Sequence, residues 1–345
     1  MQSKRSYVKK PRSLRLADSV AAAVVLLPLS AFAQTTAAPA TAAEALPTVT
    51  VKEQAIDPNP NAEVGAPYKA KTSADSRHTR PLAETPQTIS VITKSAIDDS
   101  GFTDLKQILA AQPGITLGTG ENGNAFGDRY IIRGQEARSD VFVDGLRDPG
   151  MTTRESFAAE QVEVTKGPNS TFAGRGSAGG AVNVITKQAT LDYDFTRLSG
   201  SVGTDSHYRL TMDANKAIND TFALRVNALV GAEDVPDRSP SERKRKGLAL
   251  SGLWEVNPDL SVTVDYYGFR GKDNQPDLGR YLVGTAPARY PASGVPVYAQ
   301  TNDFLKSDVD TLTARINYPL ASDLKLTSLT RYATTSNGYA TTRAS

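Results

Sequence analysis

The chain has 345 residues, of which 39% are hydrophobic and none is cysteine, and its formal net charge is +2. The lack of cysteine excludes disulfides, thiolate metal sites and cysteine nucleophiles. No window approaches the roughly 18–20 apolar residues of a membrane-spanning helix. With only His78 and His207 present, a histidine-based zinc site is not expected.

Positive charge is concentrated at the N-terminus. The first 33 residues contain six basic residues and one acid, Asp18, so the other 312 residues carry 33 basic and 36 acidic residues. A near-neutral remainder does not indicate a nucleic-acid partner. The basic segment, an apolar run from Val20 to Leu29 and the site Ala31-Phe32-Ala33 are the three parts of a secretory signal peptide. We therefore expect residues 1–33 to direct export and to be cleaved before Gln34.

Residues 34–75 are expected to be a flexible N-terminal region, because they are rich in small polar residues and proline and show no periodicity. Within them, residues 46–52 (LPTVTVK) form an isolated β-prone heptad. Such a heptad is most simply a frayed edge strand. It can also add a strand to the open sheet edge of a partner, which needs an extended backbone more than particular side chains.

Residues 76–190 predict a mixed α/β domain of ordinary size. A strand is expected at 86–93. A short amphipathic helix is expected at 104–111, where apolar residues recur at helical spacing and Thr103 is the predicted N-cap. Further strands are expected at 129–134 and 140–144, with polar loops at 117–128 and 146–157.

Residues 161–187 contain five glycines between two alternating apolar runs. Gly174–Gly179 matches the GxGxxG nucleotide-binding fingerprint, but that fingerprint requires a preceding strand and a helix opening inside it, and here a strand pattern follows. The run 167–171 also lacks the lysine of a phosphate-binding loop. We therefore interpret the glycines as turns and close backbone contacts. Since the sequence contains no nucleophile elbow or HExxH motif, we expect no enzymatic activity.

From Thr196 onward, apolar and polar residues alternate with period two in seven segments, which predict seven strands. Alternation alone also fits one sheet of a soluble sandwich. The connections at 217–220, 257–259 and 320–323 are short, and those at 232–246 and 271–306 are long. Short turns at one end and long loops at the other are typical of outer-membrane barrels. The basic run 243–246 is then expected at the solvated base of an external loop, near anionic lipid headgroups.

Four motifs stand out in the N-terminal half: YIIRG at 130–134, VFVDGL at 141–146, EVTKGP at 163–168 and GGAVNVITK at 179–187. Together they resemble the plug domain of TonB-dependent outer-membrane receptors. The resemblance runs in order from about residue 46 to past residue 270, and it is greatest to the catecholate-type ferric siderophore receptors. It implies that residues 76–190 are the plug domain and that residues 46–52 are the TonB box.

The implied fold is an incomplete, antiparallel membrane β-barrel with an N-terminal mixed α/β plug domain, in which residues 195–345 supply about seven strands. Bacterial single-chain barrels have an even number of strands, from about 8 upward, and a lumen that holds a plug corresponds to about 22 strands. Residues 341–345 also lack the terminal aromatic strand typical of this family. We therefore expect the first, N-terminal portion of a longer receptor, whether as a fragment, a truncated gene product or a sequencing break. The 345-residue product by itself is not expected to form a sealed pore.

The resemblance implies TonB-dependent import of a ferric siderophore, of the catecholate type, through the outer membrane of a Gram-negative cell. The iron would arrive already chelated, so the resemblance implies no protein metal site and no cofactor. The implied partners are the TonB C-terminal domain, acting with ExbB and ExbD, the ferric siderophore and outer-membrane lipid. Another cargo, such as a cobalamin, haem or a glycan, and a nonfunctional truncated receptor remain alternatives.

An anionic iron chelate would be held by guanidinium, aromatic and polar groups. We predict that the ligand is contacted by Asn122, Phe126, Arg147, Arg154 and Phe157 of the plug loops and by Asn274, Arg280 and Tyr281 beyond the strands. The predicted TonB-box contacts are Leu46, Pro47, Thr48, Val49, Thr50 and Val51. As a hypothesis, Arg133, Asp140, Asp144 and Glu163 pair with lumen charges and hold the plug.

Overall fold

The structure is a computed structural model of the chain. It describes residues 62–63, 65–75, 77–118, 129–137, 139–148, 152–174, 176–277, 282–294, 297, 299–321 and 324–342. The signal peptide predicted at 1–33 and the TonB box predicted at 46–52 lie outside the described residues. Among the described residues, no helix is long and apolar enough to cross a membrane.

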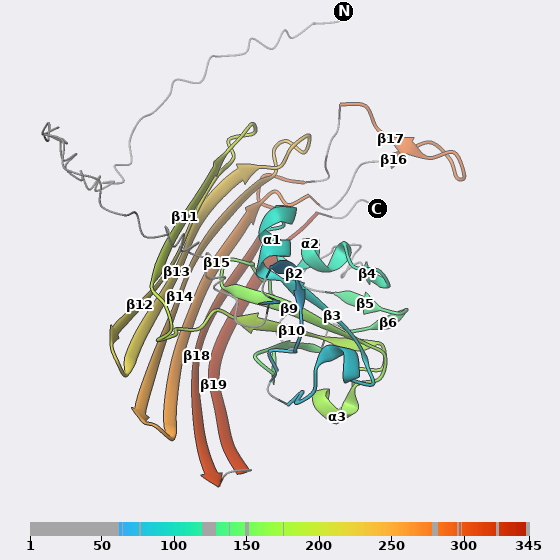
Figure 1. Cartoon of the computed structure of the whole chain (residues 1–345). Helices are drawn as coiled ribbons and strands as arrows, with labels where there is room; N and C mark the ends of the chain where they lie inside the picture. The colour runs from blue at the N-terminus through green and yellow to red at the C-terminus, as the bar shows by residue number, and fades with distance from the viewer. Residues whose placement is uncertain are drawn as a thin grey trace, which may run out of the picture. The chain divides into compact units, whose positions relative to one another are not determined.

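The N-terminal part of the described chain is a mixed α/β domain, which we call the plug (Figure 1). Its main sheet is antiparallel except for one parallel pair, β10–β7. In spatial order this sheet contains β3 (Thr88–Thr93), β9 (Ala159–Lys166), β10 (Gly180–Thr186), β7 (Val141–Val143) and β8 (Leu146–Arg147). The remaining elements of the plug are β1 (Ala62–Glu63), β2 (Ala66–Ala70), η1 (Leu82–Glu84), α1 (Lys94–Ser100), α2 (Leu105–Ala110), β4 (Ile115–Leu117), β5 (Tyr130–Ile132), β6 (Gln135–Glu136) and α3 (Ser170–Ala173).

Side-chain caps set where the two longer helices begin. Helix α1 follows Thr93, whose hydroxyl accepts a hydrogen bond from the N–H of Ala96, and it ends at Gly101, which has a φ of 69°. Helix α2 confirms the predicted helix. The prediction that Thr103 caps it is wrong by one residue, because the Asp104 carboxylate accepts the N–H of Gln107 at 2.8 Å.

The plug core lies between the main sheet and helix α2. Val162 and Val164 of β9 are at most 1% exposed, as is Val182 of β10. They belong to one apolar cluster with Leu105, Ile108 and Leu109, which are the residues that give α2 its helical spacing. Burial of this apolar face is what stabilises so short a helix, since isolated helices of this length are unstable in water.

The glycine-rich hairpin between β9 and β10 brings backbones into direct contact. A Cβ atom on Gly180, which has a φ of 145°, would lie 2.1 Å from the carbonyl oxygen of Thr165. A Cβ atom on Gly179 would lie 2.2 Å from the carbonyl oxygen of Ile132. The interpretation of these glycines as close backbone contacts is therefore confirmed.

The C-terminal part is one seven-stranded antiparallel sheet with the order β11-β12-β13-β14-β15-β18-β19. Its strands are β11 (Phe195–Val202), β12 (Tyr208–Asn219), β13 (Phe222–Asp234), β14 (Glu242–Asn257), β15 (Leu260–Asn274), β18 (Phe304–Ala321) and β19 (Leu324–Ala340), and a separate hairpin pairs β16 (Leu282–Val283) with β17 (Tyr290–Pro291). The seven predicted strands are thus confirmed. Two-residue turns at 220–221 and 258–259 lie at one end, and longer connections at 235–241 and 275–303 lie at the other.

The placement of the basic run 243–246 in an external loop is wrong. These residues lie inside β14, because pairing between β13 and β14 continues to Asp234 opposite Glu242. Alternation then separates the run, so that Lys244 and Lys246 are exposed while Arg243 and Arg245 are partly buried on the opposite face.

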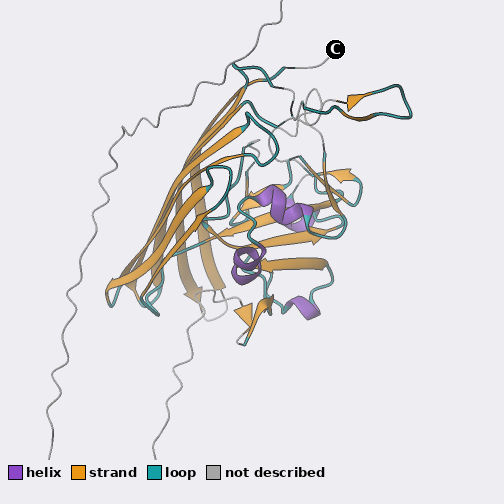
Figure 2. Ribbon diagram, turned by 90° about the horizontal axis from the view of Figure 1, so that it is seen from above, coloured by secondary structure: helices purple, strands orange, loops and turns teal. Residues whose placement is uncertain are grey.

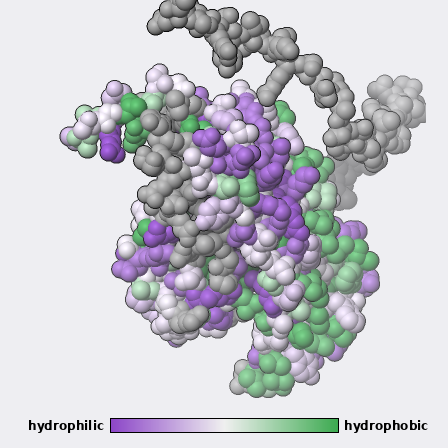
Figure 3. Space-filling model, turned by 180° about the vertical axis from the view of Figure 1, so that it is seen from behind, coloured by the Kyte–Doolittle hydropathy of each residue, from purple (hydrophilic) through white to green (hydrophobic). Residues whose placement is uncertain are grey.

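The two faces of the large sheet differ in chemistry. One face lies against the plug (Figures 1 and 2) and carries polar side chains such as Asp213, Arg225 and Asn227, each at most 5% exposed. The opposite face exposes apolar side chains along the strands, which gather over the sheet in Figure 3. They include Leu198, Leu210, Leu224, Leu248, Trp254, Val264, Leu312, Ile316 and Leu326. An apolar outer band with polar residues inside is the pattern of strands that face lipid.

We predict that Gly180→Ala destabilises the plug by at least about 1–3 kcal/mol, because the new methyl group meets the carbonyl of Thr165 and the backbone conformation is unfavourable for alanine. Hydrogen exchange of the β9 and β10 amides would become correspondingly faster. Gly200→Ala is the matched control, since its nearest neighbour would lie at 3.7 Å. Equal protection of β9 and β10 in the two variants would contradict the assigned role of Gly180.

Candidate functional site: the interface between plug and sheet

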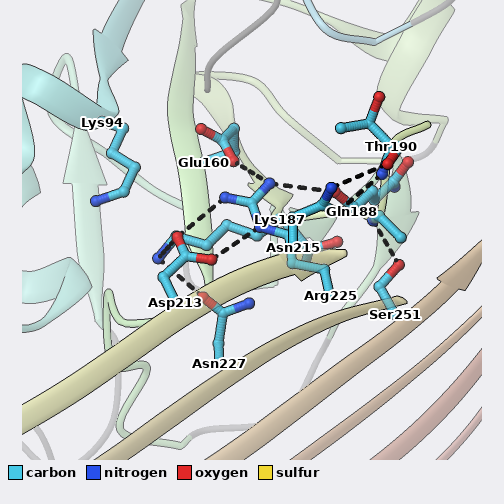
Figure 4. A network of polar contacts seen from close by, with 12 residues as sticks. Lys94, Glu160, Lys187, Gln188, Thr190, Asp213, Asn215, Arg225, Asn227 and Ser251 are labelled. Atoms are coloured by element: carbon cyan, nitrogen blue, oxygen red, sulfur yellow. Dashed lines mark hydrogen bonds and ion pairs between the residues drawn. The ribbon is translucent and has the colours of Figure 1, made fainter. Parts of the chain in front are cut away.

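The plug is joined to the sheet by a buried network of charged side chains (Figure 4). Arg225 of β13 binds Asp213 of β12 through two hydrogen bonds of 2.9 and 3.0 Å. The same guanidinium lies 3.0 Å from the carboxylate of Glu160, which comes from β9 of the plug. Arg225 is 2% exposed. One arginine therefore connects a carboxylate of the plug with a carboxylate of the sheet.

Lys187, immediately after β10, completes this network. Its ammonium group lies 3.0 Å from Asp213 and donates hydrogen bonds to the carbonyl of Phe157 at 2.7 Å and to the amide oxygen of Asn227 at 3.1 Å. Burial lowers the pKa of Lys187 to about 8, with Lys94 acting in the same direction and Asp213 opposing it. Burial also raises the pKa of the Glu160 carboxyl, against the opposing effect of Arg225. The charges are paired, but at a desolvation cost.

The segment after Lys187 is fastened to the sheet by backbone hydrogen bonds. The N–H of Ala189 donates to the Ser251 hydroxyl at 3.0 Å. The side chain of Asn215 accepts from the N–H of Thr190 at 3.0 Å and donates to the carbonyls of Thr190 and Tyr193. The C-terminal end of the plug is thus tied to strands β12, β13 and β14, directly before the chain enters β11.

A second polar contact lies near the end of the sheet with the long connections. Glu155 of the plug accepts a hydrogen bond from Arg209 at 2.8 Å and lies 3.6 Å from Arg245. Burial raises the pKa of this carboxyl, opposed by the two arginines. Arg245 also pairs with Asp273 of β15. Arg245, one of the two inward-facing residues of the basic run 243–246, therefore contributes to the contact with the plug.

Apolar packing supports the interface at one point. Phe157 is 6% exposed and stacks on Tyr267 at a centroid distance of 5.7 Å. A Cβ atom on Gly247 would lie 2.5 Å from its ring, so glycine at this position makes room for the aromatic side chain. Leu229 and Phe269 belong to the same cluster. Because these residues enclose its ring, Phe157 is, like Arg147, a weaker candidate among the predicted ligand contacts.

A cavity of about 100 Å³ lies between the plug and strands β14, β15, β18 and β19. At its edge Asp144 of the plug lies 3.8 Å from Arg315 and 3.5 Å from Arg331. Arg331 also donates to the carbonyl of Val143 at 3.1 Å. On this side of the interface the charged side chains border a cavity, and the ion pairs of Asp144 are longer than those of the Arg225 network.

The hypothesis that four charged residues pair with the sheet holds for one of them. Asp144 faces two arginines of the sheet, as expected. Asp140 instead pairs inside the plug with Arg147 at 2.8 Å. Glu163 accepts hydrogen bonds from the Ser73 hydroxyl and the N–H of Ala74, both at 2.7 Å, and Arg133 lies beside Gly167 of the plug. The carboxylates that reach the sheet most directly, Glu155 and Glu160, are not among the four.

The predicted ligand contacts that the structure describes are dispersed. Arg147 donates to the carbonyl of Ala173 at 2.7 Å and lies over the ring of Phe142. Arg154 pairs with Asp148 at 3.0 Å. Asn274 donates to Glu242 at 3.2 Å at the end of β15. Asn122, Phe126, Arg280 and Tyr281 lie outside the described residues, so no common ligand site is assembled from the described part of the prediction.

Comparison with known proteins identifies the domain. A model of the TonB-dependent receptor plug domain matches residues 81–181. Residues 81–181 are thus a domain of the TonB-dependent receptor plug family. A probable TonB-dependent siderophore receptor, PiuA of Acinetobacter baumannii, is 36% identical over 280 residues, which are 79% of this chain and 37% of PiuA. A probable TonB-dependent receptor, BfrD of Bordetella pertussis, is 38% identical over 254 residues, or 73% of this chain and 32% of BfrD.

Solved receptor structures agree with this assignment. The closed form of the ferric-catecholate import receptor Fiu from Escherichia coli superposes with a TM-score of 0.72 at 30% identity, covering 79% of this chain and 40% of that chain. The crystal structure of PiuA superposes with a TM-score of 0.71 at 35% identity. The chain thus spans about a third of the length of the curated relatives and carries the plug and seven strands of this fold.

We predict that Arg225→Met in this plug–sheet network loosens the plug by about 3–5 kcal/mol, because Glu160 and Asp213 would be left buried without their shared partner. Since the chain lacks cysteine, a thiol introduced by Val164→Cys reports plug opening through its reactivity in urea. The midpoint of that reaction should fall. Glu160→Gln is the control and should leave the midpoint unchanged or raised, as it removes a costly buried charge. An unchanged midpoint in Arg225→Met would contradict the network's role.

The same assay tests the Lys187 charge. An unfolded lysine keeps its proton up to a pKa of about 10.4, whereas the folded group loses it near pH 8. Between these values the unfolded state binds more protons, so the free energy of plug unfolding rises with pH, by about 3 kcal/mol in all. Below pH 8 this dependence disappears. Lys187→Met should remove the rise between pH 8 and 10, and an identical rise in both proteins would refute the assignment.

Proposed function

We propose that this chain belongs to a receptor that imports a ferric siderophore through the outer membrane and is driven by TonB. The observation that carries the proposal is a plug held by polar and charged groups against the inner face of a sheet whose outer face is apolar. Groups paired in this way can exchange their partners for water. A domain that must shift to open a path is better served by such an interface than by a purely apolar one.

A catecholate chelate is the proposed cargo class. The support comes from the similarity to the catecholate siderophore receptor Fiu of Escherichia coli, which is 31% identical to this chain over 286 residues. The proposed ligand contacts are Asn122, Phe126, Arg154, Asn274, Arg280 and Tyr281. Arg147 is a weaker candidate, because its guanidinium already binds Asp140 and the carbonyl of Ala173. Iron would be cargo that enters with its own ligands.

The described contacts suggest how a pull on the N-terminus reaches the plug. Ser73 and Ala74 are bound to the Glu163 carboxylate of β9, and Arg77 donates to the carbonyl of Phe172 at 2.6 Å. A partner that grips residues 46–51 by strand addition would first load β2, where the Thr93 hydroxyl donates to the carbonyl of Pro67 at 2.6 Å, and then the contacts of Ser73, Ala74 and Arg77. Strand β9 lies between β3 and β10 in the plug sheet, so the load would enter near the centre of the domain.

We predict that deleting residues 46–52 from a full-length receptor carrying this sequence abolishes ferric-siderophore uptake while ligand binding persists. The reason is that the segment contacts the energy-transducing partner and not the cargo. Uptake of radioactive iron as a catecholate chelate, and quenching of intrinsic fluorescence by the same chelate, measure the two properties separately. Uptake at the parental rate would refute the proposed mechanism.

Two point variants sharpen this test. Val49→Pro removes a backbone donor and should block uptake, whereas Val49→Thr keeps an extended, β-prone backbone and should be tolerated. Haem, a cobalamin and an oligosaccharide serve as competing cargoes in the binding assay. Quenching by one of them, with none by the ferric catecholate, would replace the proposed cargo without affecting the TonB step.

A further inference from the structure

Three lysines stand side by side on the outer face of the large sheet. Lys244 of β14 is the register partner of Lys272 of β15, and Lys272 is the register partner of Lys306 of β18. All three side chains are exposed. Like charges placed directly opposite one another on neighbouring strands are destabilising. An anion bound at this row of three lysines would therefore offset the repulsion between them.

The acids of the same face do not supply that anion for the middle lysine. Asp308 pairs with Lys306 at 2.6 Å, and Asp310 pairs with Arg270 at 2.6 Å. Glu242 lies 3.7 Å from Lys244 and also accepts a hydrogen bond from Asn274. At the end of β13, Asp234 accepts from the Ser206 hydroxyl. Within the described part of the chain, Lys272 and Lys246 of the next row have no acid within ion-pair distance.

These cations lie where the apolar band of the sheet ends. Along β14, the next outward-facing residues after Lys246 are Leu248 and Leu250. Their register neighbours on β13 are Ala228 and Val226, respectively. The lysine row is at the end of the sheet with the long connections 235–241 and 275–303. In outer-membrane barrels that end faces the cell exterior.

The distance of the lysine row from the short-turn end of the sheet matches the thickness of a bilayer's hydrocarbon core. Leu260 begins β15 at the short-turn end, and Lys272 follows it along the same strand. At about 3.3 Å per residue and a strand tilt of about 40°, the two positions are roughly 30 Å apart along the membrane normal. The hydrocarbon core of a bilayer has about this thickness. Lys272 would thus lie at the polar surface of the outer leaflet.

We propose that Lys244, Lys272 and Lys306, with Lys246 beside them, bind the phosphate groups of a phosphorylated glycolipid in the outer leaflet. The proposal rests on the membrane location given under the proposed function. Phosphate oxygens accept hydrogen bonds from several ammonium groups at once and neutralise their repulsion. The acyl chains of the same lipid would meet Leu248 two rows below the lysines, and Leu250 and Leu312 one row further, past Arg270, Asp308 and Asp310. The apolar side chains that begin on the same face within this distance favour a lipid over a free anion.

The test uses a full-length receptor carrying this sequence, reconstituted with bisphosphorylated lipid A or its dephosphorylated form. Native mass spectrometry then counts the lipid retained after detergent exchange. The triple variant Lys244→Gln, Lys272→Gln, Lys306→Gln should retain the bisphosphorylated lipid at least about tenfold less strongly than the parent, since each lysine near an anionic surface contributes about fivefold. A control variant, Lys216→Gln with Lys325→Gln, changes exposed lysines at the short-turn end and should match the parent.

Several results would overturn the site. These are equal retention by the triple variant, equal retention of dephosphorylated lipid by the parent, and displacement of lipid A by millimolar inorganic phosphate, which would indicate a simple anion site. Raising the salt concentration should reduce the amount of lipid that the parent receptor retains. This measurement uses the parent alone and does not depend on whether a variant folds. Loss of lipid binding with normal ferric-siderophore uptake would separate this site from the proposed function. A receptor that fails to enter the bilayer would instead remove the membrane location itself.

Discussion

The interface between plug and sheet depends on one guanidinium group. Arg225 is almost completely buried and contacts carboxylates from both sides, Glu160 of the plug and Asp213 of the sheet. Two buried carboxylates could not remain ionised next to each other without such a partner. Lys187 adds a second cation, and its own burial is costly enough to lower its pKa. Arg225 is therefore the member of this network on which both carboxylates depend.

The interface is uneven from one side to the other, and this bears on how a path could open. Toward β12, β13 and β14 the plug is held by the Arg225 network, by the hydrogen bonds of residues 189–190 and by Phe157. Toward β18 and β19 it faces a cavity, with the longer contacts of Asp144 to two arginines and the hydrogen bond from Arg331 to the carbonyl of Val143. A rearrangement that keeps the first side fixed and moves the second breaks fewer contacts.

Much of the fold could be predicted because it follows from periodicity. The alternation from Thr196 onward gave seven strands and their two faces, and the spacing of Leu105, Ile108 and Leu109 gave helix α2. Helix α1 was not predicted, because its short sequence has no clear apolar stripe, and only the Thr93 cap and Gly101 mark its ends. Charged residues were harder to place. The run 243–246 has a loop-like composition, yet its alternate residues pair with Glu233 and Asp273 inside strand β14.

The site was less predictable than the fold, since it depends on residues distant in sequence. Nothing local distinguishes Glu160 from Glu163, although one reaches Arg225 and the other binds Ser73 within the plug. One signal was available: charged residues such as Asp213 and Arg225 stand on the inward face of their strands between uncharged residues two positions away on either side. Such residues on an inward face require partners, and Lys187 and Glu160 of the plug provide them.

The most direct measurement is a scan of lipid and plug contacts along β14 in a bilayer. Single thiols at positions 248 to 254, introduced into the cysteine-free chain and labelled with a nitroxide, report oxygen accessibility and mobility. We expect high oxygen accessibility at positions 248, 250, 252 and 254, and immobilised, inaccessible labels at 249 and 251. Water-accessible labels at the even positions, or mobile labels at 249 and 251, would contradict a plug lodged against the inner face of a lipid-embedded sheet.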